Sequence, residues 1–520
     1  MKKIFKVSLF SAALLLMGVA CTSDYLDTAP ESSTSPATIF ESTQNAELAV
    51  NGLCKMMTTQ YLSTQGMNGE GTIKTWYGNF GNDLQRCNQT GWAALWNHTY
   101  NNSTNSIYLL YPWYYYYKLI ANANQIIVNI DEADGEEADK QFIKAQALTF
   151  RAHAFTMLTQ LYCYRWSEGS NNPGLVLRLD TSTGSMPLST LAETFAQIYS
   201  DLDEAISLFS QSGRNRGSDE FYKPNLQVAY AVYTRAALIR EDWQTVVRTA
   251  PLARQGHPLM SRSEYMDGGF SDVKGIPDEW IWGVYEAGDQ TLYYYGFFAY
   301  QASDASSSMQ RTYPLAISKE LYEQIPATDA RRKMWLEPTE AEWAACNAAG
   351  QSVGTADNDV LYARAFAEYG DKLYETSLVY GYMQFKFQAS FQPGGGSFNI
   401  YRAAEMYLSE AEALCHIGGQ DAKVQSLLNE LNANLDDSYN CTKTGADLLT
   451  EVKLYRRIDL WGEGFDYYDY KRWNEPIVRK SKADGGSFHT SFALTINPED
   501  GNRWTWKIPQ KETDYNDAIN

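Results

Sequence analysis

The sequence is poor in the residues with which most enzymes perform chemistry. It has five histidines among 520 residues, and no two of them stand at the spacing of metal ligands. It contains no G-x-S-x-G nucleophile elbow, no P-loop and no dinucleotide-binding glycine motif. Paired carboxylates for glycoside hydrolysis stay open, because an acidic chain offers many such pairs. These absences favour a binding protein over an enzyme, and we expect no cofactor and no bound metal.

Cysteine and positive charge are also scarce. None of the seven cysteines forms a C-x-x-C pair or lies at a zinc-like distance from a histidine. All of them except Cys21 are expected to be mostly free, buried thiols. Lysine and arginine number 43 against 62 acidic residues, which gives a net charge of −19. Such a chain repels nucleic acid and anionic headgroups, so polyanionic partners are disfavoured.

Long apolar runs are limited to the N-terminus. Three lysines precede the apolar stretch 7–17, and the small residues 18–20 lead directly into Cys21. This pattern predicts a secretory signal peptide over residues 1–20, too short to span a bilayer permanently. A cysteine directly after the cleavage site resembles the lipobox of bacterial lipoproteins, in which that cysteine is acylated. The alternative is an ordinary signal peptide with a cysteine there by chance.

Helical periodicity dominates the mature chain. Residues 22–38 are rich in Ser, Thr and Pro, which is typical of a flexible tether. Apolar residues then recur at spacings of three and four over 144–162, which predicts one apolar face of a helix. Thr190 and Glu193 form a capping-box pattern that predicts the start of another helix.

Two segments have the same two-helix plan. Residues 225–253 break at Glu241–Asp242, and residues 400–434 break at Gly418–Gly419. Small residues mark the faces on which these helices are expected to pack, namely Ala236, Ala237, Ala411 and Ala413. The pattern predicts tetratricopeptide-type helix pairs, with a degraded consensus.

The middle of the chain has a different texture. Between about 255 and 398, helical pattern gives way to short aromatic runs broken by Gly, Asp and Ser, and a strand or loop is expected at 280–298. We therefore predict a mainly α fold. Its parts are a signal peptide (1–20), a lipidated N-terminus and tether (21–45), and one domain (46–520) with a helical scaffold (about 46–255 and 400–480) and a loop-rich ligand-binding insert (about 256–398).

Aromatic residues are the positive signal for function. The chain has 37 tyrosines, 21 phenylalanines and 14 tryptophans. Flat rings stack on the C–H faces of sugars, while amide, carboxylate and guanidinium groups reach the hydroxyls. Two segments, 76–105 and 293–298, mix such groups, although core packing is the competing explanation for each ring. The residues predicted to bind a glycan are Trp76, Asn88, Trp92, Trp96, Tyr293, Tyr294 and Tyr295. For Trp113 and the tyrosines at 114–117, which lie on a helical stretch, core packing is favoured.

Several motifs together resemble one known family. They include RAAEMYLSEAEA (402–413), LWGEGFDYYDYKRW (460–473) after Arg456–Arg457, WKIPQKETDYN (506–516), CTSDYLDTAPES at the start of the mature chain, and KAQALTFRAHAF (144–155). In this order they are similar to the SusD/RagB family along the whole mature chain. One departure is Tyr455, where the family usually has Glu before the Arg pair.

The resemblance implies a Bacteroidetes outer-membrane lipoprotein, exposed at the cell surface and anchored through lipid on Cys21. Such proteins bind oligosaccharides without catalysis and form the lid of a SusC-like TonB-dependent transporter. The resemblance further implies that the C-terminal motif residues are buried packing and ion-pair positions: Glu405, Glu412, Glu463, Asp466, Asp469, Arg472 and Trp473. A RagB-like peptide importer, a surface glycoside hydrolase and a purely structural transporter cap stay open as alternatives.

Overall fold

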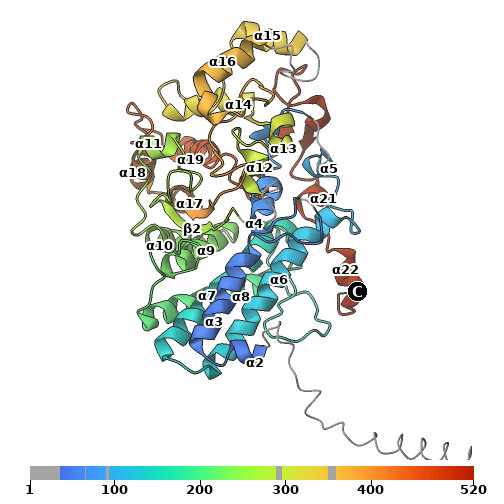
Figure 1. Cartoon of the computed structure of the whole chain (residues 1–520), viewed down its shortest axis with the longest axis vertical. Coiled ribbons are helices and arrows are strands. Elements are labelled where there is room, and N and C mark those ends of the chain that lie inside the picture. The colour runs from blue at the N-terminus through green and yellow to red at the C-terminus, as the bar shows by residue number, and fades with distance from the viewer. Residues whose placement is uncertain (1–35, 65, 89–92, 289–295, 349–358, 520) are drawn as a thin grey trace, which may run out of the picture.

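The computed structural model describes residues 36–519, apart from 65, 89–92, 289–295 and 349–358. Within these ranges the chain is mainly helical, as predicted, with three two-stranded antiparallel sheets (Figure 1). None of the helices in this part of the chain combines the length and apolarity needed to cross a bilayer. The first described element, α2 (Pro36–Ile39), starts inside the segment predicted to be a tether.

The first half of the chain builds a layered helical scaffold. Its elements are α2 (Pro36–Ile39), α3 (Thr43–Met56), α4 (Gly69–Thr72), the π-helix η2 (Ile73–Tyr77), β1 (Leu84–Arg86), α5 (Ala93–Trp96), α6 (Ile107–Asn129), α7 (Glu137–Tyr162), α8 (Leu191–Ser212), α9 (Leu226–Ile239) and α10 (Trp243–Ala253). The long helices α3, α6, α7 and α8 lie roughly along one another in the lower part of Figure 1.

The second half alternates short elements with further helices. In order these are α11 (Arg262–Met266), β2 (Trp280–Val284), α12 (Phe297–Gln301), α13 (Ser308–Thr312), β3 (Leu315–Ile317), α14 (Lys319–Tyr322), α15 (Glu340–Ala348), α16 (Asp359–Tyr369), β4 (Phe398–Arg402), α17 (Ala403–Ile417), α18 (Asp421–Asn432), α19 (Gly445–Asp459), α20 (Asp466–Trp473), β5 (Ile477–Arg479), β6 (Leu494–Ile496), α21 (Gly501–Trp504) and α22 (Gln510–Tyr515).

The helices predicted at 144–162 and after Thr190 are confirmed as α7 and α8. Thr190 accepts a hydrogen bond from the Glu193 amide at 3.1 Å, and the Glu193 carboxylate accepts one from the Thr190 amide at 2.7 Å. Both orphan donors at the start of α8 are thereby satisfied. A buried ion pair of 2.6 Å between Arg151 and Asp201 then joins α7 to α8.

The two predicted helix pairs are also confirmed. Helix α9 is followed by α10 after a turn at Glu241, whose φ is 59°, and α17 is followed by α18 after Gly418, whose φ is 80°. The four small residues expected on the packed faces, Ala236, Ala237, Ala411 and Ala413, are all fully buried. Because small side chains leave little bulk between backbones, α9, α10 and α17 pack closely, with Ala237 and Ala413 in one apolar cluster.

The insert is more ordered than the sequence suggested. Strand β2 confirms the strand expected near 280, and it pairs with β4, which ties the two ends of the insert together. The prediction of an irregular segment was wrong for α15 and α16, which are helices of 9 and 11 residues. Their sequences are rich in Ala, a good helix former, and so many of their residues are apolar that no single apolar face stands out.

Most rings and thiols serve the core. Trp113, Tyr115 and Tyr116 on α6 are buried, as favoured from the sequence. His153 is fully buried and bonded to the Tyr401 hydroxyl at 3.0 Å, which fits a structural role. Five cysteines are free thiols in the part of the chain that the structure describes: Cys54, Cys87, Cys163, Cys415 and Cys441.

Candidate functional site

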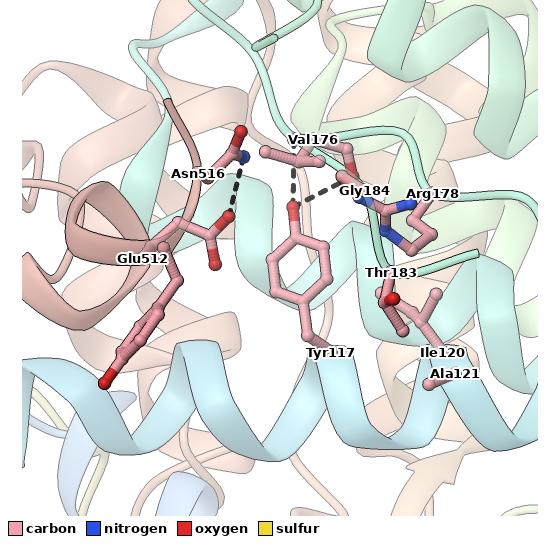
Figure 2. Close-up of a pocket in the computed structure, with 10 residues that line it drawn as sticks. Tyr117, Ile120, Ala121, Val176, Arg178, Thr183, Gly184, Glu512 and Asn516 are labelled. Carbon is pink, nitrogen blue, oxygen red and sulfur yellow. Dashed lines mark hydrogen bonds between the residues drawn. The ribbon is translucent and has the colours of Figure 1, made fainter. Parts of the chain in front are cut away.

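Two open pockets lie on the helical scaffold. One, of about 250 Å³, lies between α6, residues 176–184 and the C-terminal helix α22 (Figure 2). The other, of about 450 Å³, lies between α3, α7 and Arg214. Neither is lined by any residue predicted to bind a glycan. The pockets and the predicted aromatic site therefore occupy different places on the chain.

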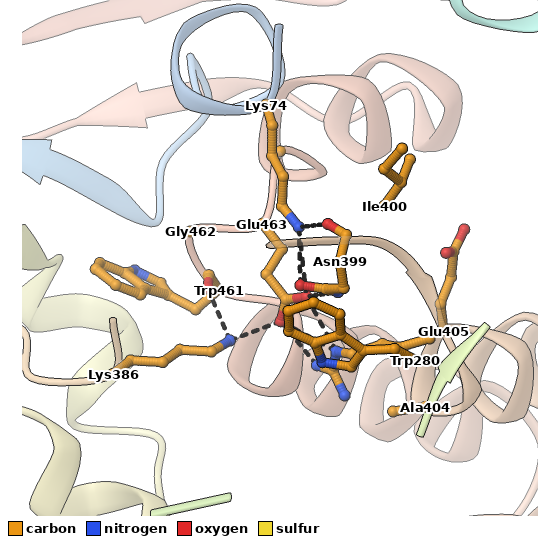
Figure 3. A network of polar contacts seen from close by, with 12 residues as sticks. Lys74, Trp280, Lys386, Asn399, Ile400, Ala404, Glu405, Trp461, Gly462 and Glu463 are labelled. Atoms are coloured by element: carbon orange, nitrogen blue, oxygen red, sulfur yellow. Dashed lines mark hydrogen bonds and ion pairs between the residues drawn. The ribbon is translucent and has the colours of Figure 1, made fainter. Parts of the chain in front are cut away.

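The densest cluster of charge is buried and structural. Glu463 is fully buried and its carboxylate lies 2.7 Å from the Lys386 amine, 2.8 Å from the Arg402 guanidinium and 3.9 Å from the Lys74 amine (Figure 3). Burial alone raises the pKa of Glu463, but the three cations hold it well below its ordinary value. Asn399 donates to the same carboxylate at 2.9 Å. With no exposed member, this cluster joins scaffold segments and cannot contact a ligand.

The structural role implied for the C-terminal motif residues is confirmed for most of them. Glu405 pairs with Arg235 at 2.8 Å, and Asp469 pairs with Arg456 at 2.7 Å. Glu412 pairs with Arg472, and Trp473 donates to Glu412 at 2.9 Å. Asp466 differs, because its carboxylate accepts the backbone amides of Asn82 and Asp83 instead of pairing with a cation.

A long-range strand pair joins β1, in the first predicted aromatic segment, to β3, which follows the second along the chain. Strand β1 pairs antiparallel with β3, with Leu84 opposite Ile317. The pairing continues past the end of β1, where the Cys87 amide donates to the Pro314 carbonyl at 3.1 Å. Cys87 therefore lies beside Pro314, the residue that precedes β3.

Arg86, a residue missed from the sequence, holds this arrangement in place. Its guanidinium is buried 4.7 Å from the Trp76 ring and donates to the carbonyls of Tyr313 at 2.6 Å and Tyr300 at 3.0 Å. These carbonyls lie at the C-terminal ends of α13 and α12, where helix dipoles attract positive charge. Burial lowers the pKa of Arg86 to about 9. One side chain thus fixes β1, α12 and α13 relative to one another.

Trp76 and Trp96 were wrongly predicted to bind ligand. Both side chains are 0% exposed. Trp76 lies in η2 and packs edge-on against Tyr300 at 5.3 Å, while Trp96 ends α5 and packs against Phe80 at 5.8 Å. Their amide neighbours are structural too, since Asn79 is buried and donates to backbone carbonyls. These rings are part of the hydrophobic core and are not exposed to a ligand.

Of the remaining residues predicted to bind a glycan, the structure describes only one. Asn88 is half-buried directly after β1, beside the segments described above. Trp92 and Tyr293–Tyr295 lie outside the described residues, as does Cys21. Their roles stay predictions.

Arg311 and Tyr374 bring a cation and a ring together in the described part of the chain. Arg311 on α13 is half-buried, donates to the Thr376 hydroxyl at 2.9 Å, and lies 5.7 Å from the centre of the Tyr374 ring. Its Nε has no hydrogen-bond partner, and no carboxylate lies within ion-pair distance among the described residues. The pair offers donors beside a flat face. Nothing in the local sequence signals it, because Arg311 and Tyr374 are far apart in the chain and meet only through folding.

Two carboxyl groups with perturbed ionisation lie in the adjacent loops. Burial raises the pKa of Asp304 to about 7, opposed by the Ala389 amide that donates to it at 2.9 Å. Burial raises the pKa of Glu286 to about 8, with a further contribution from the nearby charge of Asp272. Both groups change protonation near neutral pH, so the loops around the face carry a pH-dependent charge.

Two family models match the chain. Residues 24–238 match a model described as "Starch-binding associating with outer membrane", and residues 252–520 match one described as "SusD family". The chain belongs to the SusD family. A comparison with curated proteins gives no match.

Solved structures share the fold of this SusD family member. A SusD-like carbohydrate binding protein from Bacteroides vulgatus is 22% identical, with a TM-score of 0.73, covering 92% of this chain and 98% of that one. A SusD superfamily protein from Bacteroides thetaiotaomicron is 21% identical, with a TM-score of 0.72 and coverage of 92% and 99%. Another from Bacteroides vulgatus is 19% identical, with a TM-score of 0.73 and coverage of 92% and 98%.

Tyr455, where the family usually has Glu, has a local structural explanation in this SusD family member. The Tyr455 ring is buried, packs edge-on against Tyr439 at 4.8 Å and lies 5.1 Å from the Arg331 guanidinium. Arg331 is itself held by Asp329 and Asp459 at 2.7 and 2.8 Å. A ring therefore replaces a carboxylate beside a cation that already has two acidic partners.

Proposed function

We propose that this protein is a cell-surface lipoprotein that binds oligosaccharides without catalysis and delivers them to a SusC-like TonB-dependent outer-membrane transporter. The observation that carries the proposal is the β1–β3 pair: past its end Cys87, next to Asn88, donates to the Pro314 carbonyl, three residues after Arg311, whose guanidinium lies 5.7 Å from the Tyr374 ring. Membership of the SusD family and the fold shared with a SusD-like carbohydrate binding protein support a glycan as the ligand.

The chemistry of the face suits a neutral, hydroxyl-rich ligand. A sugar ring can place its C–H face on Tyr374 while its hydroxyls accept from the guanidinium of Arg311 and exchange bonds with Asn88. Trp92 and Tyr293–Tyr295 are proposed to extend this surface with further rings. Because desolvated hydroxyls offset much of the stacking energy, we expect affinities on the order of micromolar to millimolar.

Ligand class is tested by binding of the purified protein to a glycan array and to a peptide panel. We expect binding to oligosaccharides, weakened by Arg311→Ala and by Tyr374→Ala. The matched control is Arg248→Ala, because Arg248 is exposed and lies 5.6 Å from the Tyr233 ring in a similar pair on the scaffold. Binding to peptides alone would replace the glycan with a peptide ligand, as in a RagB-like importer.

The contribution of the aromatic loops is tested separately. Trp92→Ala combined with Tyr294→Ala is expected to weaken glycan binding further than Arg311→Ala alone. Unchanged binding in both sets would place the ligand site elsewhere on the protein, whereas absence of binding by the wild type to every glycan and peptide would favour a purely structural transporter cap. Release of shortened products on incubation with oligosaccharides would show a hydrolase and contradict the non-catalytic role.

Anchoring and partnership rest on Cys21. We expect the wild-type protein to incorporate labelled fatty acid, to be reached by protease on intact cells, and to co-purify with a SusC-like transporter. Cys21→Ala is expected to lose the label and the membrane fraction while keeping glycan affinity. Retention of label in Cys21→Ala would overturn the assignment of the lipidation site.

A further inference from the structure

The pocket of about 250 Å³ beside the C-terminus has the features of a small ligand site. Its floor is the ring of Tyr117 on α6, and the hydroxyl of Tyr117 is fully engaged, donating to the Val176 carbonyl at 3.0 Å and accepting from the Val176 amide at 2.9 Å. Figure 2 shows this ring standing between Glu512 and Asn516 on one side and Arg178 and Thr183 on the other. The volume lies below the ~300–1,000 Å³ of pockets for drug-sized ligands, so one ring is the size that fits.

The α22 wall is held rigidly and keeps acceptor capacity free. Asn516 joins α22 to the loop before α8, because its side chain accepts from the Met186 amide at 2.9 Å and donates to the Met186 carbonyl at 2.8 Å. Glu512 accepts one hydrogen bond on each oxygen, from Trp113 at 3.1 Å and from Asn516 at 2.9 Å. A carboxylate has about four lone-pair positions, so two further donors can be accepted here without moving the side chain.

The opposite wall carries Arg178, whose guanidinium already has hydrogen-bond partners within the chain. Arg178 donates to the carbonyl and the hydroxyl of Ser182 at 3.0 and 2.7 Å and to the Gly184 carbonyl, and Asp180 lies 3.9 Å away. These bonds fold the 178–184 loop around the guanidinium. The Arg178 guanidinium is therefore not free to bind an anionic ligand, and the Glu512 carboxylate would repel such a ligand. The pocket thus disfavours acids and zwitterions.

An unusually exposed ring stands at the pocket. Tyr515 lines it and is 85% exposed, the highest exposed fraction among the large apolar side chains in the described part of the chain. The same helix turn supplies Glu512 and Asn516, so the ring and the acceptors sit on one rigid element. An exposed ring beside acceptors in a preformed hollow is the combination that sugar recognition uses.

We infer that this pocket is a second carbohydrate site, for one neutral sugar unit, at which Tyr515 stacks on the ring and Glu512 accepts its hydroxyls. It extends the proposed function to a separate place, because α22 and α6 lie well away from α12 and α13 in Figure 1. A second weak site on the same chain raises the effective concentration of a branched or long glycan near the first.

The test uses the full mature chain and saturation-transfer NMR with individual sugars. The neutral probes are glucose, galactose, mannose and N-acetylglucosamine, and the charged probes are glucuronate and glycine. We expect at least one neutral probe to bind, and Tyr515→Ala to weaken it about threefold to tenfold, the range for loss of one ring contact. Tyr515→Phe keeps the ring, and Tyr164→Ala removes another exposed tyrosine outside the pocket, so both are expected to bind like the wild type.

The two sites are separated by crossing this set with Arg311→Ala. Sugar binding that survives Arg311→Ala but is weakened by Tyr515→Ala supports the pocket even if the loop face proves inactive. Binding that is lost in Arg311→Ala and unchanged in Tyr515→Ala overturns the pocket and leaves the proposed function intact. Absence of binding by all neutral probes, or equal binding of the charged probes, also overturns it. Because Tyr515 is exposed, the variants are expected to unfold at the wild-type temperature.

Discussion

Removing the charge of Glu463 is expected to be among the most damaging conservative changes in the scaffold. Glu463→Gln keeps the shape but leaves three buried cations, on Lys74, Lys386 and Arg402, without their shared carboxylate. Loss of one partner of a buried ion pair costs about 3–5 kcal/mol of unfolding free energy. The amide NH₂ group is also a hydrogen-bond donor, and the surrounding cations offer it no acceptor. We therefore expect a loss within that range at pH 6.

The loss is expected to shrink at alkaline pH. In the wild type, burial lowers the pKa of Lys74 to about 7 and of Lys386 to about 8, although Glu463 opposes this, against 10.5 for an ordinary lysine. Without Glu463 both pKa values fall further. Above the lowered pKa of these lysines, the unfolded variant binds more protons than the folded variant. The unfolding free energy of the variant therefore begins to rise at a lower pH than that of the wild type. The difference between the two proteins is then smaller at pH 9 than at pH 6.

Urea unfolding followed by tryptophan fluorescence measures both quantities. The control is Glu136→Gln, since Glu136 pairs with Arg214 at 2.6 Å on the exposed surface, where such a pair contributes below about 1 kcal/mol. A loss in Glu463→Gln as small as in the control at pH 6, or one that does not change between pH 6 and pH 9, would refute the reasoning.

Three further predictions concern the cap, the buried rings and the perturbed carboxyl. Thr190→Ala is expected to cost about 1 kcal/mol in urea unfolding and Thr190→Ser much less, because the cap at α8 needs only the hydroxyl; equal losses would contradict this. Trp96→Ala is expected to cost about 3–5 kcal/mol, seen as a lower unfolding temperature, because the ring is fully buried; a stable variant with weaker glycan binding would restore Trp96 as a contact. The folded pKa of Glu286 is raised to about 8, so its stabilising contribution is full below about pH 4.5 and is lost as pH rises through 8. Glu286→Gln is thus expected to gain stability relative to the wild type over that window in unfolding measured at several pH values, and a constant difference would count against the raised pKa.

Much of the scaffold could be predicted from the sequence because its signals are local. The apolar spacing of α7, the Thr190–Glu193 capping box and the breaks at Glu241 and Gly418 each act within a few residues. Local patterns of this kind survive folding when tertiary packing agrees with them. Helices α15 and α16 were missed because apolar residues make up most of both sequences, so that no single apolar face stands out and their many alanines are the only indication of a helix.

The site was harder to predict because burial is decided over long distances. Trp76 and Trp96 share their amide-rich surroundings with sugar-binding loops, but Arg86 and Phe80 cover them in the fold. Arg311 meets Tyr374 only after separate segments pack, and no spacing in the sequence indicates it. Composition therefore indicates which stretch of the chain is rich in rings that could bind a sugar, whereas only the fold decides which of those rings are exposed.

The β1–β3 pair also sets when the protein becomes able to bind. Gln85 and Ile317 are 232 positions apart, so the helices from α3 to α10 can form and pack long before β1 finds its partner. Contacts that close such long loops form late in folding. The proposed ligand face, which depends on β3, is thus completed only after the second half of the chain has followed the first. A chain cut short before residue 315 would keep the helices α3 to α10 and lack β3, so that binding at the proposed face would require the second half of the chain.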